Sequence, residues 1–272
     1  MFFLFLGLAQ ADVQPATNVA VGLSNWRVGF SIDARHGIRI PLFERDDSVL
    51  FQGTGLKAQA AINTSPAYFR GGGQVTFSPL AILDLSGYGM YDAYYGNLQT
   101  IVDYDTASAN YGSNADIATY VESNPARQGS GTGWHTGGAA TLKLKVGPVI
   151  VLSSTDVSYW DIQRDEAIGN YFFEREKELM MEFGGDTLLQ ENALVLYEIN
   201  FEEQQSNLRV GSITTYRQTF RAEDVLLRTG LIAMYNQSNG LTHALLIQPY
   251  LQDRSFSGSF PPFAAYQFRY AR

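Results

Sequence analysis

Apolar and polar side chains alternate along most of this chain with a period of two residues. Leu142, Leu144 and Val146, for example, alternate with Lys143 and Lys145. The same alternation recurs over residues 24–33, 149–159, 193–201, 225–236 and 264–270. Because successive side chains of a strand point to opposite faces, this period predicts β-strands. The segments are about ten residues long, near the length that a tilted strand needs to cross a bilayer.

Clusters of Gly, Pro, Asn, Asp and Ser separate these segments and predict turns. They lie at residues 33–37, 64–67, 78–79, 184–186, 205–207 and 236–240. Division of the chain among ten to fourteen strands leaves about 19 to 26 residues for each strand and its connection. We therefore expect an all-β fold, a single closed antiparallel transmembrane β-barrel of about 12 strands (range 10–14). Short and long connections do not alternate cleanly along the sequence, so the sidedness of the loops stays open.

One stretch interrupts the alternation. Residues 96–137 are rich in Gly, Ser, Asn, Thr and Asp, with only sporadic apolar residues. A structureless connection of this length is unusual inside a compact domain, whereas long extracellular loops are normal in outer-membrane barrels. We expect one long loop here, whose aromatic side chains fold over the barrel mouth or contact a partner. These side chains are Tyr104, Tyr111, Tyr120 and Trp134.

The first residues predict export. Phe2 to Leu8 form a short apolar run, and Ala9-Gln10-Ala11 has the small-x-small pattern of a signal-peptidase site. No basic segment precedes the run, and a buried N-terminal strand is the alternative interpretation. We take residues 1–11 as a signal peptide and residues 12–272 as one barrel domain.

Composition favours a membrane barrel over a soluble sandwich. Charged residues make up only 17% of the chain and aromatic residues 13%, so apolar surface is present without the charge that a water-exposed surface carries. Tyr and Trp prefer the lipid headgroup zone, and aromatic residues lie near the ends of the apolar files. They are Trp26, Tyr91, Tyr159, Trp160, Tyr171, Phe173, Phe183, Tyr197, Phe201, Tyr216, Phe220, Tyr235, Phe268 and Tyr270. A soluble sandwich or soluble barrel is the alternative, although shorter strands are typical of it.

The final segment carries a resemblance. Tyr266, Phe268 and Tyr270 alternate like the aromatic last strand that the assembly machinery of Gram-negative outer-membrane β-barrels recognises, although this chain adds Ala271 and Arg272. The chain therefore resembles that broad class over nearly its whole length, with no subfamily indicated. The resemblance implies a location in the cell outer membrane, in contact with lipid and lipopolysaccharide. It also implies extracellular loops that are available to envelope protein partners.

Composition excludes several chemistries. The chain has no cysteine, which removes disulfides, thiol catalysis and cysteine-ligated metals. A net charge of −8 without a basic patch argues against nucleic acid. Asp103, Asp105 and Asp116 are candidate Ca²⁺ ligands, but no EF-hand spacing is present, so solvated acids are the favoured interpretation. We expect neither a metal site nor a cofactor.

Two expected strands place opposite charges on their polar faces. The carboxylates lie on one face of residues 171–183, and the guanidiniums lie on one face of residues 208–221 and on the strand after it. The candidate lumen residues are Glu174, Glu176, Glu178, Glu182, Arg209, Arg217, Arg221 and Arg228. Across a narrow lumen these charges attract strongly, and they would either lock the barrel closed or select solutes by charge at a constriction. Simple neutralisation of buried charges is the alternative.

The segment 171–183 also contains a conflict. If Tyr171 and Phe173 face lipid, then Arg175 and Lys177 face lipid as well. A cation at the bilayer midplane costs about 2–4 kcal/mol. Either this strand extends above the membrane, where it meets lipopolysaccharide phosphates, or a bulge shifts its register.

One string suggests catalysis. Residues 235–240, Tyr-Asn-Gln-Ser-Asn-Gly, resemble the His-x-Ser-Asn motif of outer-membrane phospholipases and lipid A deacylases. Ser238 matches the nucleophile, but Asn236 stands in the place of the histidine base and cannot accept a proton. His243 is the nearest alternative base. We expect a polar hairpin turn here and no enzyme.

Three functions follow in order of preference. The first is a passive channel or porin for small solutes. The second is a non-conducting barrel that acts as an anchor or scaffold subunit of an envelope complex, and the third is a lipid hydrolase. Because side chains nearly fill the lumen of a small barrel, the first two are close alternatives.

Overall fold

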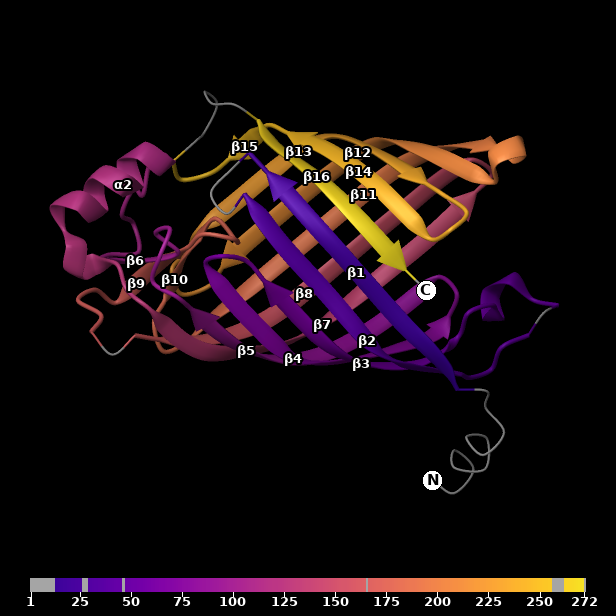
Figure 1. The fold of residues 1–272 in the computed structure, drawn as a ribbon, viewed down its shortest axis with the longest axis horizontal. Coiled ribbons are helices and arrows are strands. Elements are labelled where there is room, and N and C mark those ends of the chain that lie inside the picture. Colours follow the sequence, from indigo (N-terminus) through magenta and orange to yellow (C-terminus); the bar gives the residue numbers. More distant parts are fainter. Residues whose placement is uncertain (1–12, 26–28, 46, 165, 256–261, 272) are drawn as a thin grey trace, which may run out of the picture.

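The computed structural model describes residues 13–25, 29–45, 47–164, 166–255 and 262–271. Its strands form the expected closed antiparallel barrel of 12 strands (Figure 1). The barrel strands are β1 (Gln14–Ser24), β2 (Phe30–Pro41), β3 (Gly55–Thr64), β4 (Tyr68–Leu80), β5 (Leu83–Tyr94), β7 (Gly131–Val146), β8 (Val149–Gln163), β11 (Asp186–Phe201), β12 (Ser206–Thr219), β13 (Val225–Asn236), β14 (Leu241–Gln248) with β15 (Tyr250–Gln252), and β16 (Phe263–Ala271). β14 and β15 both pair with β13 and share one place in the ring.

The first and last strands close the ring. β1 pairs with β16 in antiparallel register from Asn18 opposite Ala271 to Ser24 opposite Ala265. Every other barrel strand pairs with its neighbours in chain order, so the wall has no open edge among the described strands. Closure matters in lipid because an unpaired backbone group there has no water to bind.

The two ends of the barrel differ. At the end where β1 starts and β16 stops, here called the terminus end, the connections are 42–54, 81–82, 147–148, 202–205 and 237–240. At the opposite loop end they are 25–29, 65–67, 95–130, 164–185, 220–224 and 253–262. All long connections except 42–54 therefore lie at the loop end, which is the sidedness of an outer-membrane barrel with its long loops outside.

Two connections of the loop end fold into regular structure. The connection 95–130 contains β6 (Ile101–Tyr104), α2 (Asn114–Ser123) and a 3₁₀ turn, Pro125–Arg127. The connection 164–185 contains β9 (Tyr171–Glu174) and β10 (Leu179–Glu182). β10, β9 and β6 pair into a separate three-stranded sheet. No helix among the described residues is long and apolar enough to span a membrane.

Three sequence expectations need correction. Residues 171–183 are an inner hairpin and not a barrel strand, because both faces of β9 and β10 are buried. The interval 96–137 is not structureless, and residues 131–137 already belong to β7, where the Gly-rich and Thr-rich sequence pairs with β5 and β8. Residues 24–33 do not form one strand, since β1 ends at Ser24 and β2 starts at Phe30.

A fourth correction concerns the turn expected at residues 33–37. These residues lie inside β2. Arg35 donates to Asp33 at 3.0 Å and to Gln74 of β4 at 2.6 Å. Asp33 and Arg35, which suggested a turn, are thus lumen-facing residues of a strand, and the exposed His36 lies on its other face.

The outer face of the barrel is apolar. Leu231, Val195 and Leu245 are each at least half exposed, and each alternates with an inward-facing residue of its strand. Tyr91 and Trp134 lie on the outer face near the loop end, and Tyr197 lies on it near the terminus end. This arrangement is an apolar band with aromatic residues near its borders, as in transmembrane barrels. Trp160 and Phe173, expected in the same border, are buried inside instead, and Trp26 lies outside the described residues.

The outward position of Leu231 gives a test of the membrane assignment. We expect Leu231→Arg to make the free energy of folding into phosphatidylcholine vesicles less favourable by about 2–4 kcal/mol, since the substitution places a cation against lipid. Gln190→Arg is the matched control, because Gln190 faces a lumen cavity. Heat-modifiable gel migration measures the folded fraction. Equal folding of the two variants would contradict the assignment of the faces.

Candidate functional site

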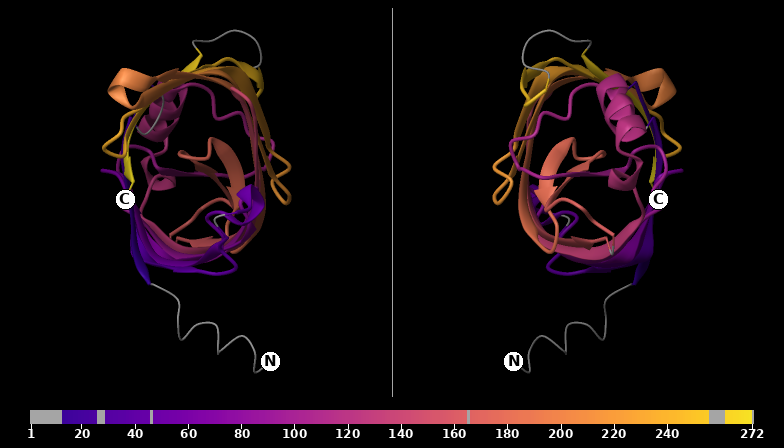
Figure 2. Two further views of the ribbon diagram at one scale, coloured as in Figure 1. Left: turned by 90° about the vertical axis from the view of Figure 1, so that its right-hand side faces the viewer. Right: turned by 90° about the vertical axis from the view of Figure 1, so that its left-hand side faces the viewer.

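The loop-end half of the lumen is filled by a protein core. The β9–β10 hairpin and β6 lie inside the ring of strands (Figure 2). Their side chains pack against inward-facing residues of the wall and form one buried hydrophobic cluster with them. Its members with 0% exposure include Ile101, Val102, Phe172, Phe173, Leu179, Met180, Met181, Ile162 and Leu226. We call this cluster of β6, β9 and β10 against the wall the plug core.

The hairpin turn, residues 175–178, points toward the middle of the lumen and carries charge. Glu174 at its start is fully buried, and its Oε1 lies 2.9 Å from Nη2 of Arg70 on β4. The Arg70 Nε lies 2.9 Å from Oδ1 of Asp92 on β5, and Arg70 also pairs with Glu176. Tyr94 donates its hydroxyl to Glu174 at 3.1 Å. One guanidinium therefore holds three carboxylates at the first wall.

The other side of the turn is held by the opposite wall. Arg228 of β13 contacts Glu178 at 2.7 Å, and Tyr250 of β15 donates to the same carboxylate at 2.8 Å. Arg217 of β12 donates to the backbone carbonyl of Lys177 at 2.8 Å. In the ring order β4 and β13 lie diametrically opposite. The turn therefore spans the lumen between Arg70 and Arg228, which lie on opposite walls. We call residues 174–178 with these two arginines the bar.

Backbone strain accompanies this bar. Glu178 has φ +59°, a left-handed conformation that is uncommon for a residue other than glycine. Its N–H donates to the Glu174 carbonyl at 2.8 Å, which closes the turn. Such conformations persist where surrounding contacts over-determine them, and here the Arg228 and Tyr250 contacts do so.

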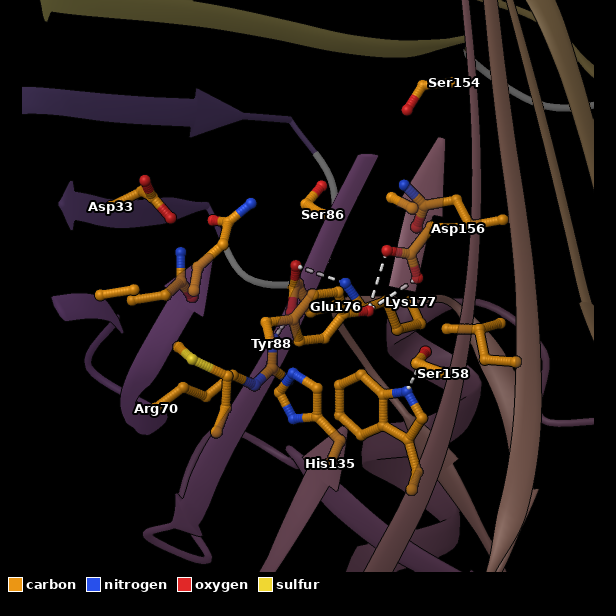
Figure 3. A pocket seen from close by; sticks show the side chains of 18 of the residues that line it. Asp33, Arg70, Ser86, Tyr88, His135, Ser154, Asp156, Ser158, Glu176 and Lys177 are labelled. Carbon is orange, nitrogen blue, oxygen red and sulfur yellow. Dashed lines mark hydrogen bonds and ion pairs between the residues drawn. The ribbon is translucent and has the colours of Figure 1, made fainter. Parts of the chain in front are cut away.

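A polar cavity of about 430 Å³ lies beside the turn (Figure 3). On one side the Tyr88 hydroxyl donates to Asp156 at 2.7 Å. On another side His135 Nδ1 lies 2.6 Å from Asp92 Oδ2, and the His135 ring stacks on Trp160 at 4.0 Å. This sets a chain from His135 through Asp92 to Arg70. The imidazole is oriented by a carboxylate that is itself held by a guanidinium.

Lys177 extends from the turn toward this cavity (Figure 3). Burial lowers the pKa of Lys177 to about 7, and the nearby cations Arg70 and Arg217 contribute to this shift. Its ammonium is 3.3 Å from Glu176. The expected conflict of Arg175 and Lys177 with lipid disappears, because both lie in the lumen.

The structure brings five of the eight candidate lumen residues together. Glu174, Glu176, Glu178, Arg217 and Arg228 all meet at the hairpin turn. Glu182 and Arg221 form a separate, more exposed pair at 3.4 Å. Arg209 lies near the terminus end, where Glu198 binds it at 2.8 Å and binds Lys145 at 2.5 Å.

Arg70, Asp92 and His135 were missed from the sequence. The signal for Asp92 was present, because an outward Tyr91 requires its neighbour to point inward. Arg70 precedes three glycines, and His135 lies in the interval assigned to a loop. The sequence positions of Arg70 and His135 do not indicate that both side chains contact Asp92; this follows only from the fold.

The other candidate chemistry is dispersed. Asp103 pairs with Arg164 at 2.5 Å, Asp105 pairs with Arg127 at 2.8 Å, and Asp116 accepts from the Ser113 backbone in a helix capping box. No group of metal-ligating side chains occurs among the described residues.

The string at 235–240 forms the hairpin between β13 and β14. Asn236 donates to Asn207 at 2.7 Å, across the strand pair. His243 Nδ1 lies 2.6 Å from the Tyr266 hydroxyl on the outer face. Its Nε2 lies 3.4 Å from Nε2 of Gln237, so the two side-chain contacts described for this histidine are to Tyr266 and Gln237 and not to Ser238.

Comparisons with known proteins support the fold. No protein-family model and no curated protein sequence matches the chain. The β domain of the Bordetella autotransporter BrkA is similar, with a TM-score of 0.52 at 9% identity over 95% of this chain and 98% of that domain. LpxR from Salmonella typhimurium (TM-score 0.46, 7% identity, 94% of this chain and 99% of that chain) and the NanC porin (TM-score 0.40, 9% identity, 93% and 98%) also match.

The likeness to BrkA concerns the fold alone. Combined with the apolar outer face, the closed wall and the long loops at one end, it identifies the chain as an outer-membrane β-barrel.

The bar across the lumen gives a stability test. Arg70→Met leaves Glu174 and Asp92, both fully buried, without their cation. We expect a loss of about 3–5 kcal/mol in the free energy of unfolding. Arg221→Met, which breaks an exposed pair, should cost at most about 1 kcal/mol. Urea unfolding in vesicles measures both values, and similar small losses would contradict a structural bar.

Proposed function

We propose that this outer-membrane barrel is closed at rest and acts as an anchor or scaffold subunit, not as an open channel. The plug core carries the proposal. Its side chains are buried, and they join the inner sheet to the wall on several sides. Because protein interiors are close-packed, a buried core in this place obstructs the passage of water and ions along the lumen.

The charge arrangement supports a stable closed state. Arg70 and Arg228 hold the turn from opposite walls, and their carboxylate partners Glu174 and Glu178 are buried. Withdrawal of the hairpin would break both pairs. Arg70 would keep Asp92 of β5, whereas Arg228 would lose its carboxylate, and the loss of one partner of a buried pair costs about 3–5 kcal/mol. Passive conduction through the lumen would therefore require a displaced hairpin.

The loop end offers an ordered surface for partners. A capping box starts α2, Tyr104 stacks on Tyr120 at 5.0 Å, and Arg127 forms two hydrogen bonds to Asp105. Leu98, Ile168 and Phe220 are more than half exposed at this end. Ordered loops bind without a large loss of conformational entropy, which supports a docking role toward envelope proteins or lipopolysaccharide.

Planar-bilayer conductance tests the proposal. We expect the wild-type protein to show no discrete conductance steps. A variant with residues 171–182 replaced by a short Gly-Ser linker should show discrete steps, because β9 and β10 of the plug core are then removed. The linker fits, since Phe183 N donates to the Asn170 carbonyl at 3.0 Å and the two ends of the loop already meet.

The matched control replaces residues 237–240, the terminus-end hairpin, with Gly and Ser of equal length. This change leaves the plug core intact, so we expect the control variant to show no discrete conductance steps. Discrete steps from the wild-type protein would overturn the proposal. Heat-modifiable migration would first show that the deletion variant folds. If the folded variant then gave no discrete conductance steps, the hairpin would not be what obstructs the lumen.

A further inference from the structure

The inner wall of the barrel is not uniformly polar. On the side of β11 to β14, the lumen-facing positions carry aliphatic side chains that border a second cavity of about 440 Å³. They are Leu194, Ile213, Ile232, Met234 and Leu246. The lumen of a transmembrane barrel is normally polar, because it contains water. Contact with membrane lipid does not explain aliphatic side chains at lumen-facing positions, and neither does packing of the plug core.

These side chains form layers along the barrel axis. Leu194 and Ile213 are direct cross-strand partners, and Ile232 and Leu246 form another such pair. Leu196, Met234 and Ala244 lie two residues nearer the terminus end on their strands. Each strand contributes at most two of these inward-facing aliphatic side chains, which cover about 7 Å of its length at about 3.3 Å per residue. Across the adjacent strands β11 to β14 they form one apolar wall of the cavity, against which a hydrocarbon chain can pack.

A polar layer covers the patch on its loop-end side. Thr215 donates to Asn192 at 3.1 Å, and Gln248 donates to Thr215 at 3.3 Å. Asn192, Thr215 and Gln248 each lie two residues from an aliphatic member of the patch on the same strand. All three border the cavity.

A guanidinium without a carboxylate partner lies above this polar layer. Arg217 borders the cavity, and its Nη1 donates to the backbone carbonyl of Lys177. Among the described residues no carboxylate lies within ion-pair distance of Arg217, and its Nε is buried without a hydrogen-bond partner. Glu178, the nearest candidate in the turn, is committed to Arg228 and Tyr250. A partly buried guanidinium with an unpaired buried Nε is stabilised when an anion accepts its hydrogen bonds.

We infer that this cavity binds a single-chain amphiphile with an anionic head group, of the size of a medium-chain fatty acid. The carboxylate accepts from Arg217, and the amide and hydroxyl groups of Asn192 and Thr215 surround the head. The acyl chain lies along the aliphatic layers toward the terminus end. The carboxylates of Glu176 and Glu178 also line the cavity, but Arg70 and Arg228 pair with them. Arg217 therefore selects the anionic head, and the aliphatic patch selects a hydrocarbon tail.

Equilibrium binding of radiolabelled laurate to the refolded barrel in dodecyl maltoside tests the inference. We expect saturable binding of one laurate per barrel that excess dodecyl maltoside does not compete away. Dodecanol, with the same tail and a neutral head, should bind at least about tenfold more weakly, because it lacks the charge-assisted hydrogen bonds. Non-saturable laurate binding, or equal affinity for dodecanol, would overturn the inference without the use of any variant.

Two variants locate the site. Arg217→Gln should weaken laurate binding about tenfold or more and leave dodecanol binding unchanged, whereas Ile213→Asn should weaken both. Arg221→Gln is the matched control, because Arg221 is exposed and does not border the cavity. Unchanged laurate affinity in folded Arg217→Gln would contradict the assignment of the head-group site. The absence of conductance steps neither supports nor contradicts laurate binding. Failure of the binding proposal can therefore be distinguished from failure of the proposed scaffold function.

Discussion

The structure depends on the pairing of a buried turn with arginines on two opposite walls. A hairpin with carboxylates at its tip is unfavourable inside a barrel unless cations meet it there. Arg70 and Arg228 supply these cations from positions diametrically opposite in the ring. Once the turn is fixed, the apolar faces of β9 and β10 are held against the wall, and the plug core follows. The division of the lumen into a polar and an amphipathic cavity then results from the position of this bar.

Much of the architecture could be predicted from the sequence because lipid imposes a strict alternation. Outward side chains must be apolar, and inward ones need not be, so a period of two survives along every barrel strand. The closed barrel and the strand number follow from this rule. The specific ion pairs do not, since their register depends on where the hairpin enters the lumen.

The errors have one physical origin. The same alternation is produced by a strand against lipid and by a short strand buried on both faces, so residues 171–183 were assigned to the wall. Phe173 and Met181 look like lipid-facing residues in sequence, yet both have 0% exposure in the plug core. Residues 33–37 suggested a turn because polar residues cluster in turns, whereas Asp33 and Arg35 are polar because they face the lumen. Periodicity reports which face a side chain takes and does not report what covers that face.

The central claim is that the hairpin is buried inside the barrel, and site-specific cysteine labelling tests it most directly. The chain has no cysteine, so a single introduced thiol reports on one position. Met180 has 0% exposure and Ile168, in the same loop, is 55% exposed. In the folded barrel we predict that a hydrophilic maleimide labels the Ile168→Cys variant rapidly and leaves Met180→Cys unmodified until urea unfolds it. Equal labelling rates at the two positions in the folded protein would contradict the account.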